Sequence, residues 1–183
     1  MDEQKRNKLK LRVLLALGVL AVAGGMGLGY SFLAAEDVSY RSACSNNMKM
    51  LATGLVLYAA DNDEKLPDAT RWMDAISPRD YRLDQWTFWC PALHKNYGYA
   101  MNVALSKASI ETLDPVKDVV LVFETDSQER NAFGMQNDLA HNRHAGLNVV
   151  FLDTSAARVS QRTMARWVWA PNRRPVSPTQ SRP

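Results

Sequence analysis

The longest apolar run of the chain lies near its N-terminus, at residues 13–33, and contains no charged side chain. An α-helix rises about 1.5 Å per residue, so about 20 apolar residues cross about 30 Å of hydrocarbon. This run is long enough. The pattern therefore predicts one membrane-spanning helix over residues 13–33.

Charged residues flank this run unequally. Five Lys and Arg residues fall within residues 1–12, whereas Glu36 and Asp37 follow the run. Basic flanks stay on the cytoplasmic side of a span. We expect a single-pass protein of the inner (cytoplasmic) membrane, with residues 1–12 cytoplasmic and the remainder extracytoplasmic. The alternative is a cleaved secretory signal, with residues 33–35 as the small-residue cleavage site. Both interpretations export the domain.

Apolar positions after the span follow a helical period. Cys44, Met48, Leu51, Leu55 and Tyr58 recur at alternating steps of four and three residues, which places them on one helical face. A stripe of this kind is typical of a helix that packs its apolar face on a sheet. We therefore expect the helix to continue beyond the membrane and to bury this face.

Polar residues 61–65 and Pro67 end this helix, because Pro disfavours helical backbone at the residue before it. The Asp-x-Asp spacing at Asp61 and Asp63 is reminiscent of a calcium loop. Leu66 stands where such a loop needs Gly, and the remaining acidic ligands are absent. The sequence therefore predicts a polar exit loop and not a calcium site.

Apolar and β-branched runs in the C-terminal part predict strands. Residues 119–124 are nearly all apolar, as expected of a central strand, and residues 147–152 are their expected partner. Residues 97–102 alternate small and large side chains, and a turn after residue 152 closes a hairpin. The predicted fold class is α+β: a long N-terminal helix packed on a small antiparallel β-sheet. About 150 residues outside the span suit one small domain, placed at residues 34–160.

Charge is divided unevenly along the chain. The first twelve residues carry net +3 and residues 158–183 carry six Arg and no acid, so with a total of +3 the residues between them are net −6. An acidic body argues against a nucleic-acid partner. The Pro, Ser and Arg composition at the C-terminus predicts a basic, disordered tail over residues 161–183.

Cys44 and Cys90 lie on the outer side of the predicted membrane, where an oxidising compartment allows disulfides. We expect a disulfide between them. The alternative is two separate buried thiols.

Two groups of side chains could carry chemistry. His141, His144 and Asp153, with Asp126 nearby across the sheet, could hold zinc, although the two His lie in a segment better suited to a loop than to a helix. The aromatic loop with Trp72, Trp86 and Trp89 could recognise a glycan, peptide or protein, or could cap a thin core. We expect structural His residues, no metal, no cofactor and no catalytic residues. No nucleophile elbow, phosphate-binding loop or Cys/His pair supports an enzyme.

Several short sequence motifs, taken in their order along the chain, resemble those of the bacterial type II secretion pseudopilin G-like proteins. These include prepilin-type proteins with a C-terminal His…Asp-Gly signature. The blocks are the helix over residues 44–51 after a span, Phe88-Trp89-Cys90-Pro91, Asn96-Tyr97-Gly98-Tyr99-Ala100-Met101-Asn102, and a hairpin motif with Arg143, His144, Gly146, Asn148 and Asp153. The resemblance implies a pilin-like fold and a protein that assembles or anchors without catalysis. Other envelope or pseudopilin-like proteins are then its expected partners.

Two family features are missing. No processing site precedes the span, since Val13 follows Arg12 directly, and the span contains no Glu. In the family this glutamate is thought to help subunits register in a filament. The hairpin turn reads Asp153-Thr154-Ser155 where the family has Asp-Gly-His.

We expect a membrane-anchored, pseudopilin-like structural or accessory protein of the cell envelope, linked to type II secretion or surface assembly. The alternative is an anchored extracytoplasmic binding module that uses the Trp-rich loop, and a metal-dependent hydrolase is a more distant third.

Overall fold

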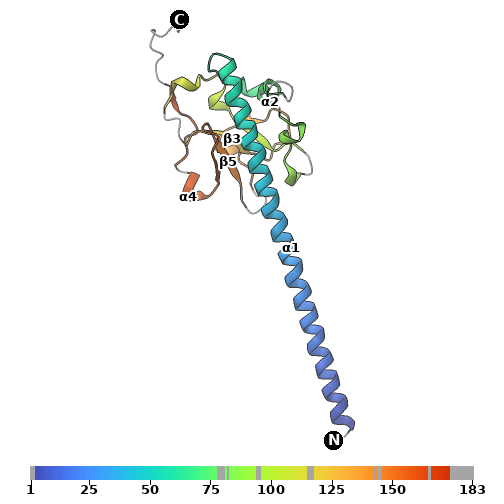
Figure 1. Ribbon diagram of the computed structural model, residues 1–183. Coiled ribbons are helices and arrows are strands. Elements are labelled where there is room, and N and C mark those ends of the chain that lie inside the picture. The colour runs from blue at the N-terminus through green and yellow to red at the C-terminus, as the bar shows by residue number, and fades with distance from the viewer. Residues whose placement is uncertain are drawn as a thin grey trace. The chain divides into compact units, whose positions relative to one another are not determined.

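The computed structural model describes residues 3–77, 81, 83–93, 96–114, 118–141, 143, 146–164 and 166–173. The chain forms two compact units, Met1–Ser39 and Tyr40–Pro183. Helix α1 (Glu3–Asp61) contributes residues to both units (Figure 1). The units are described separately below.

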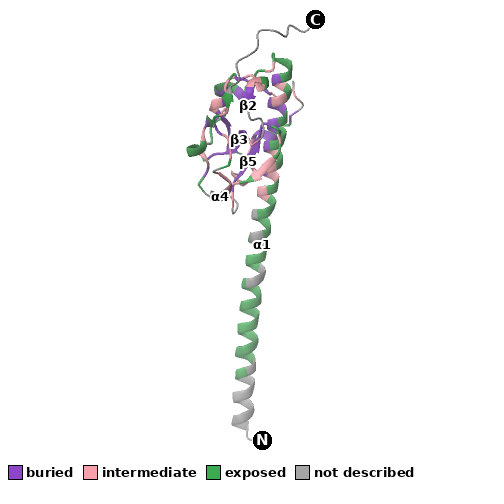
Figure 2. Cartoon of the chain, turned by 90° about the vertical axis from the view of Figure 1, so that its left-hand side faces the viewer, coloured by how far each residue is buried: buried purple, intermediate pink, exposed green. Residues whose placement is uncertain are grey.

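The first unit is the N-terminal part of α1. Leu14–Ser31 is apolar and long enough to cross a membrane, and none of this segment is buried. Large apolar side chains along it are mostly exposed, among them Leu14 at 66%, Val19 at 69% and Tyr30 at 79% (Figure 2). A helix that is apolar on all sides and exposed is suited to lipid. The segment is consistent with a single membrane span or with a signal sequence.

The second unit contains a five-stranded sheet in the order β4-β1-β3-β5-β6. Its strands are β1 (Tyr99–Asn102), β3 (Val120–Glu124), β4 (Phe133–Gly134), β5 (Asn148–Phe151) and β6 (Ala156–Arg158). The predicted central strand, its partner and the hairpin correspond to β3, β5 and β6. The pairs β1/β3, β3/β5 and β5/β6 are antiparallel, as expected.

The sheet is mixed because β4 pairs with β1 in parallel. The chain leaves β3 at one end of the sheet and reaches β4 from that end, so β4 runs against β3 and with β1. The α+β fold class is confirmed, with a helix on a small sheet as the sequence predicts. The parallel pairing of β4 with β1 at the edge of the sheet was not predicted, because the sequence indicated only an antiparallel sheet.

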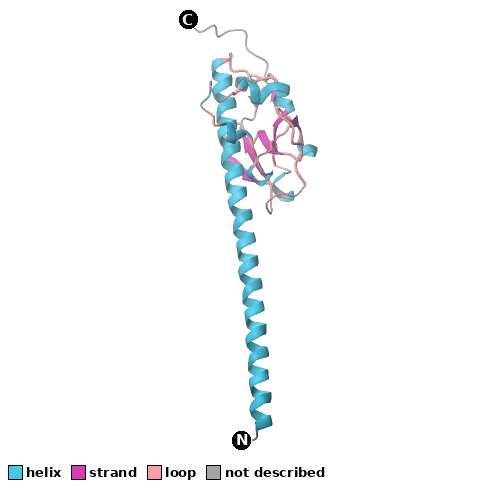
Figure 3. Cartoon of the chain, turned by 90° about the vertical axis from the view of Figure 1, so that its right-hand side faces the viewer, coloured by secondary structure: helices cyan, strands magenta, loops and turns pink. Residues whose placement is uncertain are grey.

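The predicted apolar stripe of α1 forms the centre of the core. Cys44, Met48, Leu51 and Leu55 are fully buried, and they share one cluster with sheet residues that include Val122. Figure 3 shows this part of the helix lying along the sheet. Burying a Leu or Met side chain stabilises a fold by about 1.5–3 kcal/mol, so the stripe holds the helix on the sheet. Tyr58, at the end of the stripe, is only partly buried.

The opposite face of the sheet packs on residues that follow position 160. Trp169 is buried and meets Phe123 edge to face, with ring centroids 5.2 Å apart. Asn102 donates a hydrogen bond from Nδ2 to the Trp169 carbonyl at 2.8 Å. The folded unit therefore extends beyond the predicted boundary at residue 160, through α4 (Gln161–Met164) to β7 (Asn172–Arg173). The last part of the predicted disordered tail, residues 174–183, lies outside the described residues.

Short elements connect the helix and the sheet. Strand β2 (Leu113–Asp114) pairs antiparallel with β7. The remaining elements are α2 (Trp72–Ala75) and the 3-10 turns Ala69–Arg71, Gln85–Phe88, Pro91–Leu93, Val103–Leu105, Ile110–Thr112 and Gln136–Asp138.

Candidate functional site

The three tryptophans of the predicted binding loop occupy different environments. Trp72 begins α2, is fully buried and donates its indole N–H to the Ala132 carbonyl at 2.8 Å. The prediction that Trp72 belongs to a binding surface is therefore wrong, because its ring and its polar atom are both satisfied in the core. Trp86 is 48% exposed and meets the half-buried Trp89 edge to face, with centroids 4.9 Å apart. Of the three, Trp86 offers the most surface to a ligand.

Cys44 and Cys90 form a pair of thiols, called the cysteine pair below. Their Sγ atoms are 3.0 Å apart and both side chains are fully buried. The two cysteines are neighbours, as the sequence predicts, but the structure contains two hydrogen-bonded thiols in place of the predicted disulfide. A hydrogen bond with Cys90, together with burial, raises the pKa of the Cys44 thiol well above its usual range. The Cys44 side chain is therefore held as the protonated thiol and not as the thiolate.

Arg143, from the hairpin motif, connects three of the family-like blocks. Its guanidinium is buried and donates to the Gly98 carbonyl at 3.1 Å and to the Thr125 carbonyl at 2.6 Å. The same group lies 3.7 Å from Cys90 Sγ. A buried charge needs partners of this kind to offset its lost hydration. The role of Arg143 is thus to fasten the 90–98 segment to the end of β3.

Three further residues of the hairpin motif, Gly146, Asn148 and Asp153, also have structural roles. Asn148 donates its backbone N–H to the buried Glu124 carboxylate at 2.8 Å and its side-chain amide to the Arg41 carbonyl at 3.2 Å, which ties β5 to β3 and to α1. Gly146 has φ of +148°, and a Cβ there would collide with the Arg158 guanidinium. Asp153 accepts hydrogen bonds from the backbone and hydroxyl of Ser155, which builds the hairpin turn without the family's Gly. His144 lies outside the described residues.

Of the metal candidates, the described residues His141, Asp126 and Asp153 are not assembled into a site. His141 donates its backbone N–H to Asp126 at 3.0 Å, and its Nδ1 lies 2.8 Å from the same carboxylate oxygen. The hydrogen bonds from His141 lower the pKa of Asp126. Both side chains are largely exposed, and Asp153 is engaged in its own turn. Among the described residues, no three His, Cys, Asp or Glu side chains are placed to hold a metal ion.

A second stripe of α1 faces away from the sheet in the second unit. We call it the outer face, and all its members are exposed: Asn46, Met50, Thr53, Leu57 and Ala60. Met50 is 44% exposed and Leu57 49% exposed. These five positions also alternate in steps of four and three residues, which is the spacing of a helix–helix seam. Sequence reasoning concentrated on the buried stripe and missed this one, although the same spacing signals both.

Comparisons with protein-family models, with curated proteins and with solved structures find no match for this chain. The resemblance to pseudopilin G-like proteins therefore depends on the ordered blocks of the sequence. The structure adds that Arg143, Gly146, Asn148 and Asp153 hold the fold together.

Proposed function

We propose that this chain is a single-pass, pseudopilin-like structural or accessory protein of the bacterial cell envelope, which acts through contacts with other envelope proteins and not by catalysis. Its N-terminal apolar helix is the membrane anchor, with the N-terminus in the cytoplasm and the folded unit outside. Type II secretion or a related surface assembly is the process that this role serves.

The observation that carries the proposal is the outer face of α1. One helix combines an apolar segment able to cross a membrane with a separate exposed stripe containing Met50 and Leu57. Helices packed side by side bury stripes with this spacing. A second copy of this chain or another pseudopilin-like protein, anchored in the same membrane, presents a helix of the right kind. The contact would then remove the exposed apolar side chains from water.

Photo-crosslinking in cells tests this role. A photoreactive residue at Leu57 or Met50 should yield crosslinked species larger than the monomer, and Leu57→Glu should abolish the product obtained from position 50. The matched control is a probe at Glu129, an exposed residue outside α1, which should give no such product. Only monomer from both outer-face probes would refute the assembly role.

The fate of the anchor needs a separate measurement. If the proposal is right, N-terminal analysis of the mature protein finds residues 1–12 still attached. A new terminus near Ala35 would show a cleaved signal and remove the anchor from the proposal.

A second candidate function is an anchored extracytoplasmic binding module for a glycan, peptide or protein. The observation that favours it is the exposure of Trp86, which rests on the half-buried Trp89. Trp86→Ala should abolish capture of the partner and leave the melting temperature within about 2 °C, because surface substitutions change stability little. Unchanged capture by this variant would exclude the Trp86 surface.

A further inference from the structure

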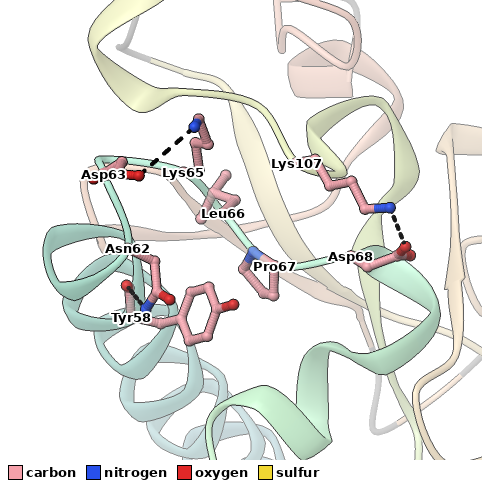
Figure 4. Close-up of a pocket in the computed structure, with 8 residues that line it drawn as sticks. All are labelled: Tyr58, Asn62, Asp63, Lys65, Leu66, Pro67, Asp68 and Lys107. Carbon is pink, nitrogen blue, oxygen red and sulfur yellow. Dashed lines mark hydrogen bonds and ion pairs between the residues drawn. The ribbon is translucent and has the colours of Figure 1, made fainter.

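A groove lies where the chain leaves helix α1 (Figure 4). We call it the exit groove. It is an open hollow of about 400 Å³, and its lining includes Tyr58, Asn62, Lys65, Pro67, Asp68 and Lys107. A second hollow of about 290 Å³ shares Tyr58, Pro67 and Asp68 and extends towards Arg71 and Asp74. Small-molecule sites commonly have volumes of about 300–1,000 Å³, so the exit groove can take one or two sugar-sized groups.

Backbone hydrogen bonds hold the walls of the exit groove in place. Leu66 N–H donates to the Ala108 carbonyl at 2.9 Å, and Lys107 N–H donates to the Pro67 carbonyl at 3.2 Å. Lys107 has φ of +55°, a left-handed conformation that is uncommon for a residue other than Gly or Asn. Strained backbone of this kind persists where the surrounding structure fixes it. The groove is therefore formed before any ligand arrives.

The exit groove has a ring-bearing part, formed by Tyr58 and Pro67, and a charged rim, formed by Lys and Asp side chains. The aromatic ring of Tyr58 stands beside the ring of Pro67, and Asp68 and Lys107 lie on one side of them (Figure 4). Lys107 Nζ is 2.7 Å from Asp68 Oδ2, and Lys65 Nζ is 3.8 Å from Asp63 Oδ2. Each Lys on the rim is thus matched by a carboxylate.

This balance of charge narrows the class of ligand. A phosphate would be attracted by the two Lys side chains but repelled by Asp68 and Asp63. A metal cation would be attracted by the two carboxylates but repelled by the two ammonium groups. A polyol avoids this conflict, because each hydroxyl donates to a carboxylate and accepts from an ammonium group. The apolar face of a sugar ring also fits against the partly buried aromatic ring of Tyr58, which lines the groove.

We infer that the exit groove binds a neutral saccharide unit of an extracytoplasmic glycan. The sugar ring lies against Tyr58, and its hydroxyls are held by Asp68 and Lys107. This site is separate from the outer face of α1 and from Trp86. It does not depend on the assembly role, so either can fail without the other.

Calorimetric titration of the full chain tests the inference. The protein is kept in a zwitterionic detergent without a sugar headgroup, because a glycosidic detergent would compete. The probes are cellotetraose, maltotetraose and chitotetraose. At least one should bind with a Kd on the order of 1 mM or lower, as an open groove with few contacts allows. Tyr58→Ala should weaken this binding at least tenfold, and Asp68→Asn at least threefold.

Matched controls separate the exit groove from the other surfaces. Trp86→Ala and Leu57→Ala should leave the affinity unchanged, and glucose 6-phosphate should bind no better than glucose. If Tyr58→Ala fails to fold, the Asp68→Asn variant decides the test, because Asp68 is partly exposed and an Asn there can still accept the hydrogen bond from Thr70 N–H. No binding of any of the three tetrasaccharides would overturn the inference. Equal affinity of the Asp68→Asn protein, or loss of binding in Trp86→Ala alone, would overturn it as well.

Discussion

Replacing Arg143 with Leu tests whether the buried guanidinium holds the second unit together. The substitution keeps an aliphatic side chain in a buried position but removes the donors to the Gly98 and Thr125 carbonyls. It also removes the group that lies 3.7 Å from Cys90 Sγ. Two segments distant in sequence, 90–98 and the end of β3, then lose their common partner.

The expected loss follows from the two carbonyl groups left behind. A buried acceptor without a donor costs about 1–3 kcal/mol, and hydrogen bonds from a charged donor contribute about 1.5–3 kcal/mol each. The apolar Leu offsets part of this by avoiding the cost of burying a charge. A loss of about 3–5 kcal/mol is expected, from a domain stability of about 5–15 kcal/mol.

Urea unfolding of the full chain in detergent measures this loss, with tryptophan fluorescence as the signal, to which the buried Trp72 and Trp169 contribute. With a slope of about 1–3 kcal/mol per molar urea, the midpoint should fall by about 2 M at unchanged slope. The control is Asp126→Asn, which removes the 3.7 Å ion pair with Arg143 but leaves both carbonyl bonds. Since Asp126 is 55% exposed, this control should cost less than about 1 kcal/mol. A loss below about 1 kcal/mol for Arg143→Leu, or equal losses for both variants, would refute the reasoning.

Three further outcomes are expected. Gly98→Ala should destabilise the protein by about 1–3 kcal/mol in the same urea assay, because the new Cβ would stand 2.7 Å from Leu93 Cδ1 in a packed site; a neutral result would contradict this packing. Both thiols of the cysteine pair should resist iodoacetamide in the folded protein and react in urea, since they are fully buried; mass spectrometry counts the adducts, and rapid labelling of the native protein would contradict the burial. Hydrogen bonds from His141 lower the pKa of Asp126, so this carboxylate contributes stability above about pH 4, and the contribution is lost as the pH falls through its folded-state pKa. In His141→Ala, an NMR titration should show the Asp126 pKa moving up towards the usual value, and an unchanged pKa would exclude the contact.

Much of the fold could be predicted because its signals are local. The apolar residues 13–33 lie within α1 because the hydrogen bonds of a helix join residues four positions apart, so the run needs no distant partner to form them. The four-and-three spacing of Met48, Leu51 and Leu55 fixes which side of the helix is buried. The apolar run 119–124 identified the central strand for the same reason, since a strand buried on both faces needs no polar side.

The environments of the candidate functional residues were harder to predict from the sequence, because they depend on contacts between segments that lie far apart in the chain. Trp72 and Trp86 are the same residue type in one irregular segment, yet one is fully buried and the other is 48% exposed. The difference arises because Trp72 has an acceptor in Ala132, sixty positions further along the chain. No local pattern carries that information.

The sequence alone determined the long apolar N-terminal helix, the buried face of its C-terminal part and the α+β class, because hydrophobic periodicity acts over a few residues. Only the tertiary structure decided that Arg143 fastens two segments, that Trp169 extends the folded unit past residue 160, and that Asp68 and Lys107 form an ion pair on one side of the exit groove. Each of these depends on hydrogen bonds, ring contacts or ion pairs between segments far apart in the chain. Such contacts are set by how the whole unit packs.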